Sequence, residues 1–264
     1  MTIDLVAIDL DGTLLGSNNT ISKRNRAAVV ALQEKGVAVT LATGRMFASA
    51  NRIAEDLGIS CPLICYQGAQ IREPSTGHIL SETVLPQPLC RRVIQFALQK
   101  GLHVNAFSGD SVFMSALTDE GKQYLEVSRV EATIVGNLLS WLATDLLKIV
   151  LVTKEEETLS VVTELQELFG EELTATRSHP LFAETISARA SKGNALKWLS
   201  GHLQIPLSNI MGIGDNLNDL SLVSTAGFGV AMGNAAPEVK EQASHITGIA
   251  DEDGVAQSIE TFAL

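Results

Sequence analysis

Two hydrophobic periods alternate along the chain. Short apolar runs with the length of β-strands occur at residues 3–8, 37–41, 63–65, 209–213 and 227–231. Stretches with helical spacing lie between them, at residues 22–35, about 46–57, 191–203 and from near Asn216 onward. Strands that alternate with helices predict a mostly parallel sheet that is covered by helices on both faces.

Two of the predicted helices carry clear signals of their own. For the helix at 22–35, Ser22 can cap the first turn, Ile21 can act as a hydrophobic staple and Gly36 can close the last turn. In the helix at 191–203, four hydrophobic side chains share one face: Ala195, Leu196, Leu199 and Leu203.

The middle of the chain departs from this alternation. Pro-Gln-Pro at 86–88 interrupts it, and two helical stretches follow near 88–99 and 155–169. In the second of these, we expect one face to hold Leu159, Val162, Leu165 and Phe169. Strand-like pieces lie between and after the helices, at 102–107, 146–153 and 173–178. The chain is therefore predicted to be an α/β protein whose two ends form one core, interrupted by an inserted α+β domain.

Composition limits the partners of this protein. Of its 264 residues 45% are hydrophobic, which suits a sizeable core, while the net charge of −11 argues against a broad basic surface for nucleic acid. No apolar run approaches the roughly 20 residues of a membrane-spanning helix, and the first residues lack the pattern of a signal peptide. The three cysteines make no disulfide framework. We expect a cytoplasmic protein without nucleic-acid or membrane partners.

Two carboxylates follow the first predicted strand, in the sequence Asp9-Leu10-Asp11-Gly12. Ligands of open parallel sheets bind at the carboxyl ends of the strands. If the chain stays extended, Asp9 and Asp11 point to the same side, and their repulsion raises one pKa unless a cation intervenes. Mg²⁺ is commonly held by one or two carboxylates together with a substrate phosphate. The alternative is that the two acids only cap a solvated strand end.

The run Asp-Leu-Asp-Gly-Thr-Leu-Leu at 9–15 resembles motif one of the haloacid dehalogenase superfamily, whose members are mostly phosphatases that work through an aspartyl-phosphate. The resemblance implies that Asp9 is the nucleophile and that Asp11 acts as general acid and then as general base. It also implies that Leu10 belongs to the residues that contact the phosphate.

Two further stretches match the family's second and third motifs in order. Ala-Thr-Gly-Arg at 42–45 is similar to motif two, which implies that Thr43 and Gly44 bind phosphate near a helix N-terminus, a location that favours anions. Arg45 either helps to orient the substrate or lies on the surface. Ser-Lys-Gly at 191–193 resembles motif three, which implies that Lys192 offsets the charge of the nucleophile and of the phosphoryl group.

Gly-Asp-Asn-Leu-Asn-Asp at 214–219 resembles motif four. The resemblance implies that Asp215 joins Asp9 and Asp11 on Mg²⁺ and that Asn218 donates a hydrogen bond to phosphate. Asp219 is expected outside the ligand set, where it fixes Lys192 or a ligand. A calcium loop is excluded, because its third position would be a leucine without a side-chain oxygen.

The resemblance covers residues 1–82 and 188–264, and the tail at 229–256 is similar to the Cof-type branch of the family. It implies a Rossmann-like parallel-sheet core with an inserted α+β cap domain at 83–187. Within the core, Gln67 stands where this branch usually has asparagine, and its extra methylene could alter a loop or a substrate contact. In the insert, five residues either face the substrate or pack: His103, Phe107, Tyr124, Arg129 and His179.

The expected function is a Mg²⁺-dependent phosphatase of small phosphorylated metabolites, with sugar phosphates as the leading class and the oligomeric state left open. Two alternatives remain: a phosphomutase that returns the phosphoryl group to a sugar, and a non-catalytic protein that binds a phosphorylated ligand. A phospho-signalling receiver is disfavoured, because its phosphorylated aspartate usually ends an interior strand well into the chain, whereas Asp9 follows the first strand.

Overall fold

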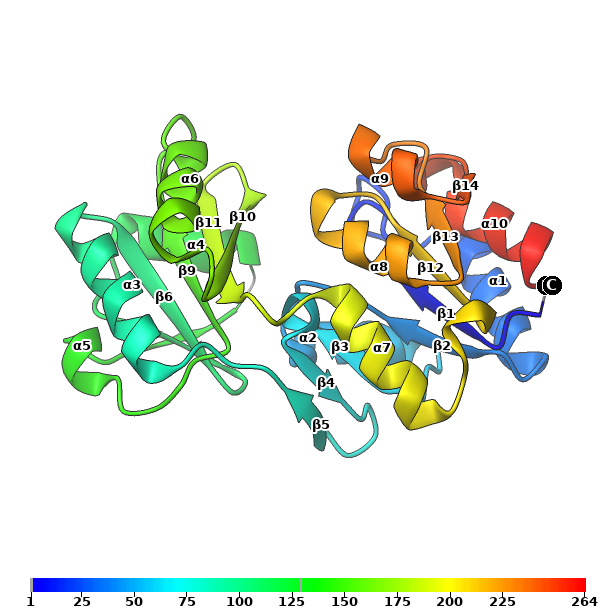
Figure 1. Ribbon diagram of the computed structural model, residues 1–264, viewed down its shortest axis with the longest axis horizontal. Coiled ribbons are helices and arrows are strands. Elements are labelled where there is room, and N and C mark those ends of the chain that lie inside the picture. The colour runs from blue at the N-terminus through cyan, green and yellow to red at the C-terminus, as the bar shows by residue number, and fades with distance from the viewer. Residues whose placement is uncertain (1, 129) are drawn as a thin grey trace. The chain divides into compact units, whose positions relative to one another are not determined.

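The structure of the protein is a computed structural model that describes residues 2–128 and 130–264. The chain forms two compact units (Figure 1). The first combines Met1–Glu82 with Ser191–Leu264, and the second is the intervening segment Thr83–Ala190. The expected second boundary, between residues 187 and 188, lies three residues before the observed one.

The first unit is built on a five-stranded parallel sheet in the order β14–β13–β12–β1–β2. Its strands are β1 (Leu5–Ile8), β2 (Ala38–Leu41), β12 (Ile210–Gly214), β13 (Phe228–Ala231) and β14 (His245–Ile246). Every residue of β1 is buried, as expected for a central strand covered on both faces. The predicted parallel sheet is therefore confirmed.

Six helices accompany this sheet: α1 (Lys23–Glu34), α2 (Phe47–Asp56), α7 (Lys192–Leu203), α8 (Leu220–Thr225), α9 (Pro237–Gln242) and α10 (Gly254–Phe262). Ser22 caps α1 as predicted, because its hydroxyl accepts a hydrogen bond from the backbone N–H of Asn25. Leu5 and Ala7 of β1 pack against buried residues of α7 and α8, namely Ala195, Leu196, Leu199 and Leu222. Leu203, expected on the same face of α7, packs at the edge of this cluster.

A small antiparallel sheet extends the first unit, and the sequence patterns did not predict it as a sheet. It consists of β3 (Leu63–Cys65), β4 (Gln70–Arg72) and β5 (Ile79–Glu82), in that order. The turn from β3 to β4 is a single 3₁₀ turn at Tyr66–Gly68. The backbone N–H of Thr43 donates to the carbonyl of Ile64, which ties this sheet to the segment after β2.

The second unit holds a six-stranded sheet in the order β10–β11–β9–β6–β7–β8, antiparallel except for the β7–β8 pair. Its strands are β6 (His103–Ser108), β7 (Ser111–Met114), β8 (Ala132–Ile134), β9 (Lys148–Val152), β10 (Leu173–His179) and β11 (Phe182–Ser187). Its helices are α3 (Gln87–Gln99), α4 (Asp119–Ser128), α5 (Leu138–Trp141) and α6 (Thr158–Phe169).

The expected buried face of α6 is partly wrong. Leu165 and Phe169 are buried as predicted, but Leu159 is 58% exposed and Val161 takes its place in the core. The helix begins at Thr158, whose side chain is buried, so the buried stripe follows Thr158, Val161, Leu165 and Phe169. Over the described residues, no helix combines the length and the apolar character that crossing a membrane requires.

Candidate active site

The parallel sheet brings the two acidic motifs of the first unit together. Strands β1 and β12 are neighbours in register, with Ile8 opposite Ile213, and the backbone N–H of Asp9 donates to the carbonyl of Ile213. Asp9 and Asp215 each follow directly after the last residue of their strand. Residues 206 positions apart in sequence therefore meet at the same edge of the sheet, where α/β proteins bind ligands.

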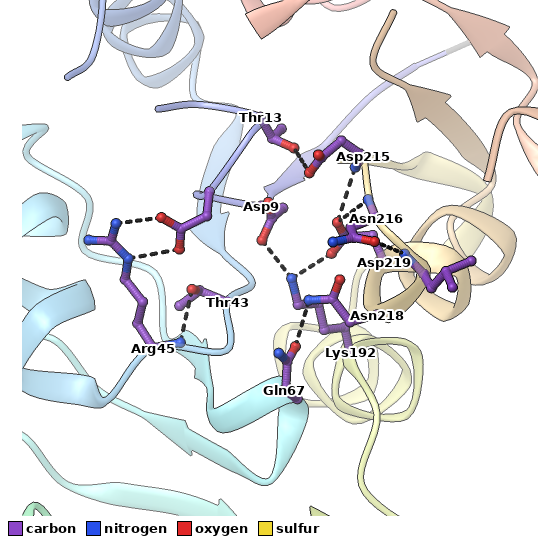
Figure 2. Close-up of polar contacts among 12 residues, drawn as sticks. Asp9, Thr13, Thr43, Arg45, Gln67, Lys192, Asp215, Asn216, Asn218 and Asp219 are labelled. Carbon is purple, nitrogen blue, oxygen red and sulfur yellow. Dashed lines mark hydrogen bonds and ion pairs between the residues drawn. The ribbon is translucent and has the colours of Figure 1, made fainter. Parts of the chain in front are cut away.

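Lys192 lies at the centre of this cluster (Figure 2). Its Nζ is 2.6 Å from Oδ1 of Asp9 and 2.5 Å from Oδ1 of Asp219, and its side chain is completely buried. Ser191 caps α7 by accepting a hydrogen bond from the N–H of Asn194, which fixes Lys192 as the first residue of the helix. The short distances and the burial make this a strong, charge-assisted set of contacts.

Three carboxylates gather around the lysine. Oxygen atoms of Asp9, Asp215 and Asp219 all lie within 4.8 Å of one another, the only such metal-binding arrangement found among the described residues. Asp219 uses both of its oxygens within the protein, because Oδ1 meets Lys192 and Oδ2 accepts from the backbone N–H groups of Asp215 and Asn216. Asp9 and Asp215 therefore keep more oxygen capacity for a ligand than Asp219.

Burial and mutual repulsion shift the pKa values of this cluster. Burial, followed by repulsion from Asp219, raises the pKa of Asp9 well above its ordinary value, although Lys192 opposes the shift. Burial and Asp219 also raise the pKa of Asp215, to about 6. Burial alone would lower the pKa of Lys192, but attraction to Asp219 and Asp9 outweighs it and raises that pKa. The lysine is thus firmly protonated, and the raised pKa values of Asp9 and Asp215 show that the site favours a proton or a cation on these acids.

The structure groups only two of the three side chains that were expected to bind Mg²⁺, because the carboxylate of Asp11 lies apart from those of Asp9 and Asp215. Its carboxylate is outside the cluster, 58% exposed, and forms a bidentate ion pair with Arg45 at 2.8 Å from Nε and 2.5 Å from Nη2. The extended conformation that would align Asp11 with Asp9 ends at once, because the N–H of Thr13 bonds back to the carbonyl of Leu10 and Gly12 has a φ of 83°. The third carboxylate of the cluster is that of Asp219, which contacts Lys192 as expected.

Arg45 also reaches the segment after β1 through a hydrogen bond from Nη2 to Oδ1 of Asn19 at 2.8 Å. The hydrogen bond with Asp11 raises the pKa of Arg45, so the guanidinium keeps its charge. Arg45 was expected either to orient the substrate or to lie on the surface. In the structure it pairs with Asp11, which the resemblance implies is the general acid and base.

The expected phosphate-binding residues border the cluster. Thr43 is buried after β2, and its hydroxyl accepts a hydrogen bond from the N–H of Arg45 at 3.1 Å. Helix α2 begins only at Phe47, so Gly44 lies in the bend before the helix and not in its first turn. Leu10 is fully buried, and its carbonyl accepts hydrogen bonds from the N–H groups of Thr13 and Leu15. Asn218 donates from Nδ2 to Oε1 of Gln67 at 2.9 Å.

Two residues that were not singled out for the site also contact Asp215. The hydroxyl of Thr13 donates to Oδ1 of Asp215 at 3.0 Å, and Nδ2 of Asn234 lies 3.3 Å from Oδ2. Asn234 further donates to the carbonyl of Gly12 at 2.8 Å. Both residues lie inside motifs quoted from the sequence, but only the fold reveals which carboxylate they hold.

The insert residues named as substrate candidates belong to the second unit. Phe107 and Tyr124 pack edge to face at 6.2 Å between ring centroids, and His179 stacks on Phe182 at 4.5 Å. His103 accepts or donates hydrogen bonds with Asn105 and Thr118. Arg129 lies outside the described residues.

Acids gathered around a buried lysine at the strand ends of a parallel α/β sheet suit phosphoryl transfer, which relies on positioning and charge stabilisation. The family model described as haloacid dehalogenase-like hydrolase matches residues 6–259, so the chain belongs to that family. It is a phosphatase, a hydrolase that acts on phosphate esters.

Individual relatives match the chain over nearly its whole length. Phosphatase YwpJ of Bacillus subtilis is 30% identical, over 96% of this chain and 97% of its own. The 5-amino-6-(5-phospho-D-ribitylamino)uracil phosphatase YcsE of the same organism is 31% identical, over 99% and 96%. Among solved structures, a haloacid dehalogenase-like hydrolase from Bacteroides thetaiotaomicron has a TM-score of 0.88 at 29% identity, over 98% of this chain and 99% of its own.

Proposed function

We propose that this phosphatase hydrolyses small phosphorylated metabolites, with Mg²⁺ bound and with a phosphoryl intermediate on Asp9. The observation that carries the proposal is the buried contact of Lys192 with both Asp9 and Asp219, beside the carboxylate of Asp215. One lysine cannot balance the charge of three carboxylates. A divalent cation would neutralise the remaining negative charge and allow a phosphate ester to bind beside the acids.

Asp9 has the surroundings of a nucleophile. Lys192 holds its Oδ1, while no described residue donates a hydrogen bond to Oδ2, which leaves that oxygen to attack phosphorus. The attack forms the bond between Oδ2 and phosphorus and breaks the bond to the ester oxygen. Lys192 favours the ionised carboxylate against burial and offsets the charge on the phosphoryl oxygens.

The carboxylates fit a hard divalent cation. Asp9 and Asp215 offer oxygen ligands that lie close together and accept one and two hydrogen bonds, whereas Asp219 accepts three, from Lys192 and two backbone N–H groups. Asp9 and Asp215 would hold Mg²⁺, and Asp219 would add negative charge and position the lysine. A bound cation would neutralise these acids and stabilise negative charge on the phosphate. The two ligands differ from the three that the motifs implied.

Asp11 supplies the proton in this proposal, but its ion pair sets a condition. Two guanidinium N–H groups of Arg45 occupy both of its oxygens, so this pair has to open before Asp11 can hold a proton toward the leaving oxygen. Asp11 then protonates that oxygen and later takes a proton from the water that attacks the phosphoryl group on Asp9. Thr43, Gly44, Asn218 and the backbone of Leu10 would bind the phosphate.

The substrate class rests on named relatives. YcsE of Bacillus subtilis acts on a phosphorylated ribitylamino-uracil, and the HMP-PP phosphatase of Yersinia pestis is 29% identical over 96% of this chain. Both names describe small phosphorylated metabolites. For this chain we propose phosphate monoesters of polyhydroxylated metabolites, with sugar phosphates first.

A metabolite panel tests the proposal. Purified protein is incubated with phosphate monoesters, with and without Mg²⁺, and released phosphate is measured for wild type and Asp9→Asn. Phosphate release that needs both Mg²⁺ and Asp9 supports the proposal. An isomerised sugar phosphate without phosphate release would indicate a phosphomutase, and ligand binding without any turnover would indicate a non-catalytic binding protein.

A further inference from the structure

The turn after β3 has an unusual backbone for its sequence. Tyr66, Gln67 and Gly68 have φ values of 52°, 58° and 91°, so three consecutive residues lie in the left-handed region and only the third is glycine. Side chains at such angles cost free energy, and a buried run of them persists only where the surrounding structure enforces it. Tyr66 and Gln67 are both buried. Strain of this kind marks a candidate functional residue.

The backbone of this turn is fixed against two motif segments of the first unit. The N–H of Tyr66 donates to the carbonyl of Arg45 at 3.1 Å, and the N–H of Gln67 donates to the carbonyl of Thr43 at 3.0 Å. On the other side, a Cβ on Gly68 would lie 2.2 Å from the carbonyl oxygen of Ser191. The turn is therefore wedged between the segment that follows β2 and the start of α7, directly before Lys192.

The side chain of Gln67 contacts two expected phosphate-binding residues. Its Oε1 accepts a hydrogen bond from Nδ2 of Asn218 at 2.9 Å, and Figure 2 shows the two amides facing each other below Lys192. Its Nε2 lies against Gly44, where an added Cβ would be only 2.3 Å away. Nε2 donates to no acceptor among the described residues. One carboxamide thus joins the second and fourth motifs and keeps two N–H groups for a ligand.

We propose that Gln67 is a positioning residue of the phosphate site. It orients the amide of Asn218, and it presents Nε2 beside Gly44 as a further donor to the phosphoryl oxygens. This inference rests on the proposed function and adds a residue to its phosphate site. Glycine would fit the backbone at position 67 without strain. Glutamine at this position strains the backbone, but its side chain reaches Asn218, which glycine could not contact.

Relief of the strain gives a direct test. Gln67→Gly removes the side chain and frees the backbone, so the variant should keep or raise the melting temperature. The matched control is Gln204→Gly, because Gln204 has a φ of 57° at the exposed end of α7 and lies outside the site. We expect Gln67→Gly to weaken inhibition by inorganic phosphate about tenfold, the usual scale for a lost hydrogen bond to a charged group. Gln204→Gly should leave phosphate inhibition unchanged.

Two further variants separate orientation from simple packing. Gln67→Glu keeps the size and the acceptor for Asn218 but removes the donors and adds a negative charge, so it should weaken phosphate binding more than Gln67→Gly. Gln67→Asn keeps the amide and should recover part of the affinity. In a double-mutant cycle with Asn218→Ala, the part of the Gln67→Gly effect that comes from orienting Asn218 should disappear, so the two effects should add to less than their sum.

The readout is phosphate affinity, measured both as product inhibition and by calorimetry with inorganic phosphate and Mg²⁺ on an Asp9→Asn background. If Gln67→Gly changes the inhibition constant by less than twofold, or if its effect adds fully to that of Asn218→Ala, the inference is overturned. An absence of turnover in the wild type would reject the proposed function instead. Because calorimetry needs no turnover, the two failures are distinguishable.

Discussion

Each unit of the protein buries a lysine, and the two lysines have different surroundings. In the first unit, Lys192 contacts Asp9 and Asp219 at 2.6 and 2.5 Å, with Asp215 in the same cluster. In the second unit, Lys148 of β9 pairs with Glu184 of β11 at 3.2 Å and lies 4.6 Å above the ring of Phe107. Both lysines are buried, and charge attraction to their acids raises the pKa of each against burial.

The number of acids per lysine separates the two clusters. Lys148 and Glu184 balance each other, and such a buried pair can often be replaced by hydrophobic residues without loss of stability. Around Lys192, three carboxylates leave an excess of negative charge that the lysine cannot neutralise. An uncompensated buried charge is costly, so the first cluster favours a partner that neutralises it, which in our proposal is a divalent cation. Both lysines are buried, so burial does not distinguish them. The excess of carboxylates around Lys192 does.

The largest expected effect is on Asp9. Asp9→Asn keeps the size of the side chain but removes the nucleophile, so phosphate release should fall by about 10⁴-fold or more. The fold should survive, because the change removes a buried charge whose pKa the site already raises. Released phosphate and the melting temperature measure the two effects. Turnover near the wild-type rate would show that no phosphoryl group passes through Asp9.

Lys192→Ala should give the next largest effect on function. The loss of its charge should lower turnover by about 10²- to 10³-fold and weaken phosphate binding at the same time. Steady-state kinetics and product inhibition by phosphate measure both quantities. Unchanged kinetics would assign Lys192 to a purely structural role, like the one that we give to Lys148.

Lys148→Met tests the other side of the comparison. It leaves Glu184 buried without its ion-pair partner, so the free energy of unfolding should fall by about 3 kcal/mol while inhibition by phosphate stays unchanged. The double variant Lys148→Met/Glu184→Leu should recover most of this stability, because it removes both charges. Chemical denaturation measures the loss and the recovery. A single variant as stable as the wild type would contradict the structural role.

Much of the first unit could be predicted because its signals are local. The apolar runs of β1, β2, β12 and β13 and the cap of α1 each depend on neighbouring residues, and the structure places these elements within two residues of their predicted limits. The strand β3 was predicted at 63–65, but its sheet with β4 and β5 was missed, since β4 and β5 are short and a turn with three left-handed residues joins β3 to β4.

The site was predicted in its members but not in its arrangement. The motifs named Asp9, Asp215 and Lys192, which the structure brings together. Asp219 contacts Lys192, as the motifs implied, whereas the carboxylate of Asp11, which they grouped with Asp9 and Asp215, pairs with Arg45 instead. Asp9 and Asp11 would point to the same side only if the chain stayed extended, but the backbone turns at Gly12. The pairing of Asp11 with Arg45 joins residues 34 positions apart, and no local pattern encodes it.

The excess charge of the first cluster predicts a pH-dependent response to metal. Burial and Asp219 raise the pKa of Asp215 to about 6, above its ordinary value of 3.8. Without metal, this shift makes the fold lose about 3 kcal/mol of stability as pH rises from below 4 to above 6. Mg²⁺ needs the ionised carboxylate, so it should raise the melting temperature by several degrees at pH 7.5 and much less at pH 5.

Asp215→Asn is the control for this response. It removes the titrating carboxylate, so the rise in melting temperature with Mg²⁺ should be small at both pH values. Differential scanning fluorimetry with Mg²⁺ or with a chelator measures each condition. If Mg²⁺ stabilises the wild type equally at pH 5 and pH 7.5, protons do not compete with the cation for Asp215.

The smallest effect concerns a single hydroxyl beside the cluster. Thr13 donates to Oδ1 of Asp215 at 3.0 Å and so holds this carboxylate in place. Thr13→Val keeps the shape and should weaken Mg²⁺ binding about fivefold, in line with about 1 kcal/mol for one hydrogen bond. Thr40→Val is the matched control, because the buried hydroxyl of Thr40 donates to the carbonyl of Pro62, away from the acids. It should lower stability by a similar amount and leave Mg²⁺ affinity unchanged. Equal Mg²⁺ affinities in the two variants would mean that the orientation of Asp215 does not depend on Thr13, and that the cluster is held by its charges alone.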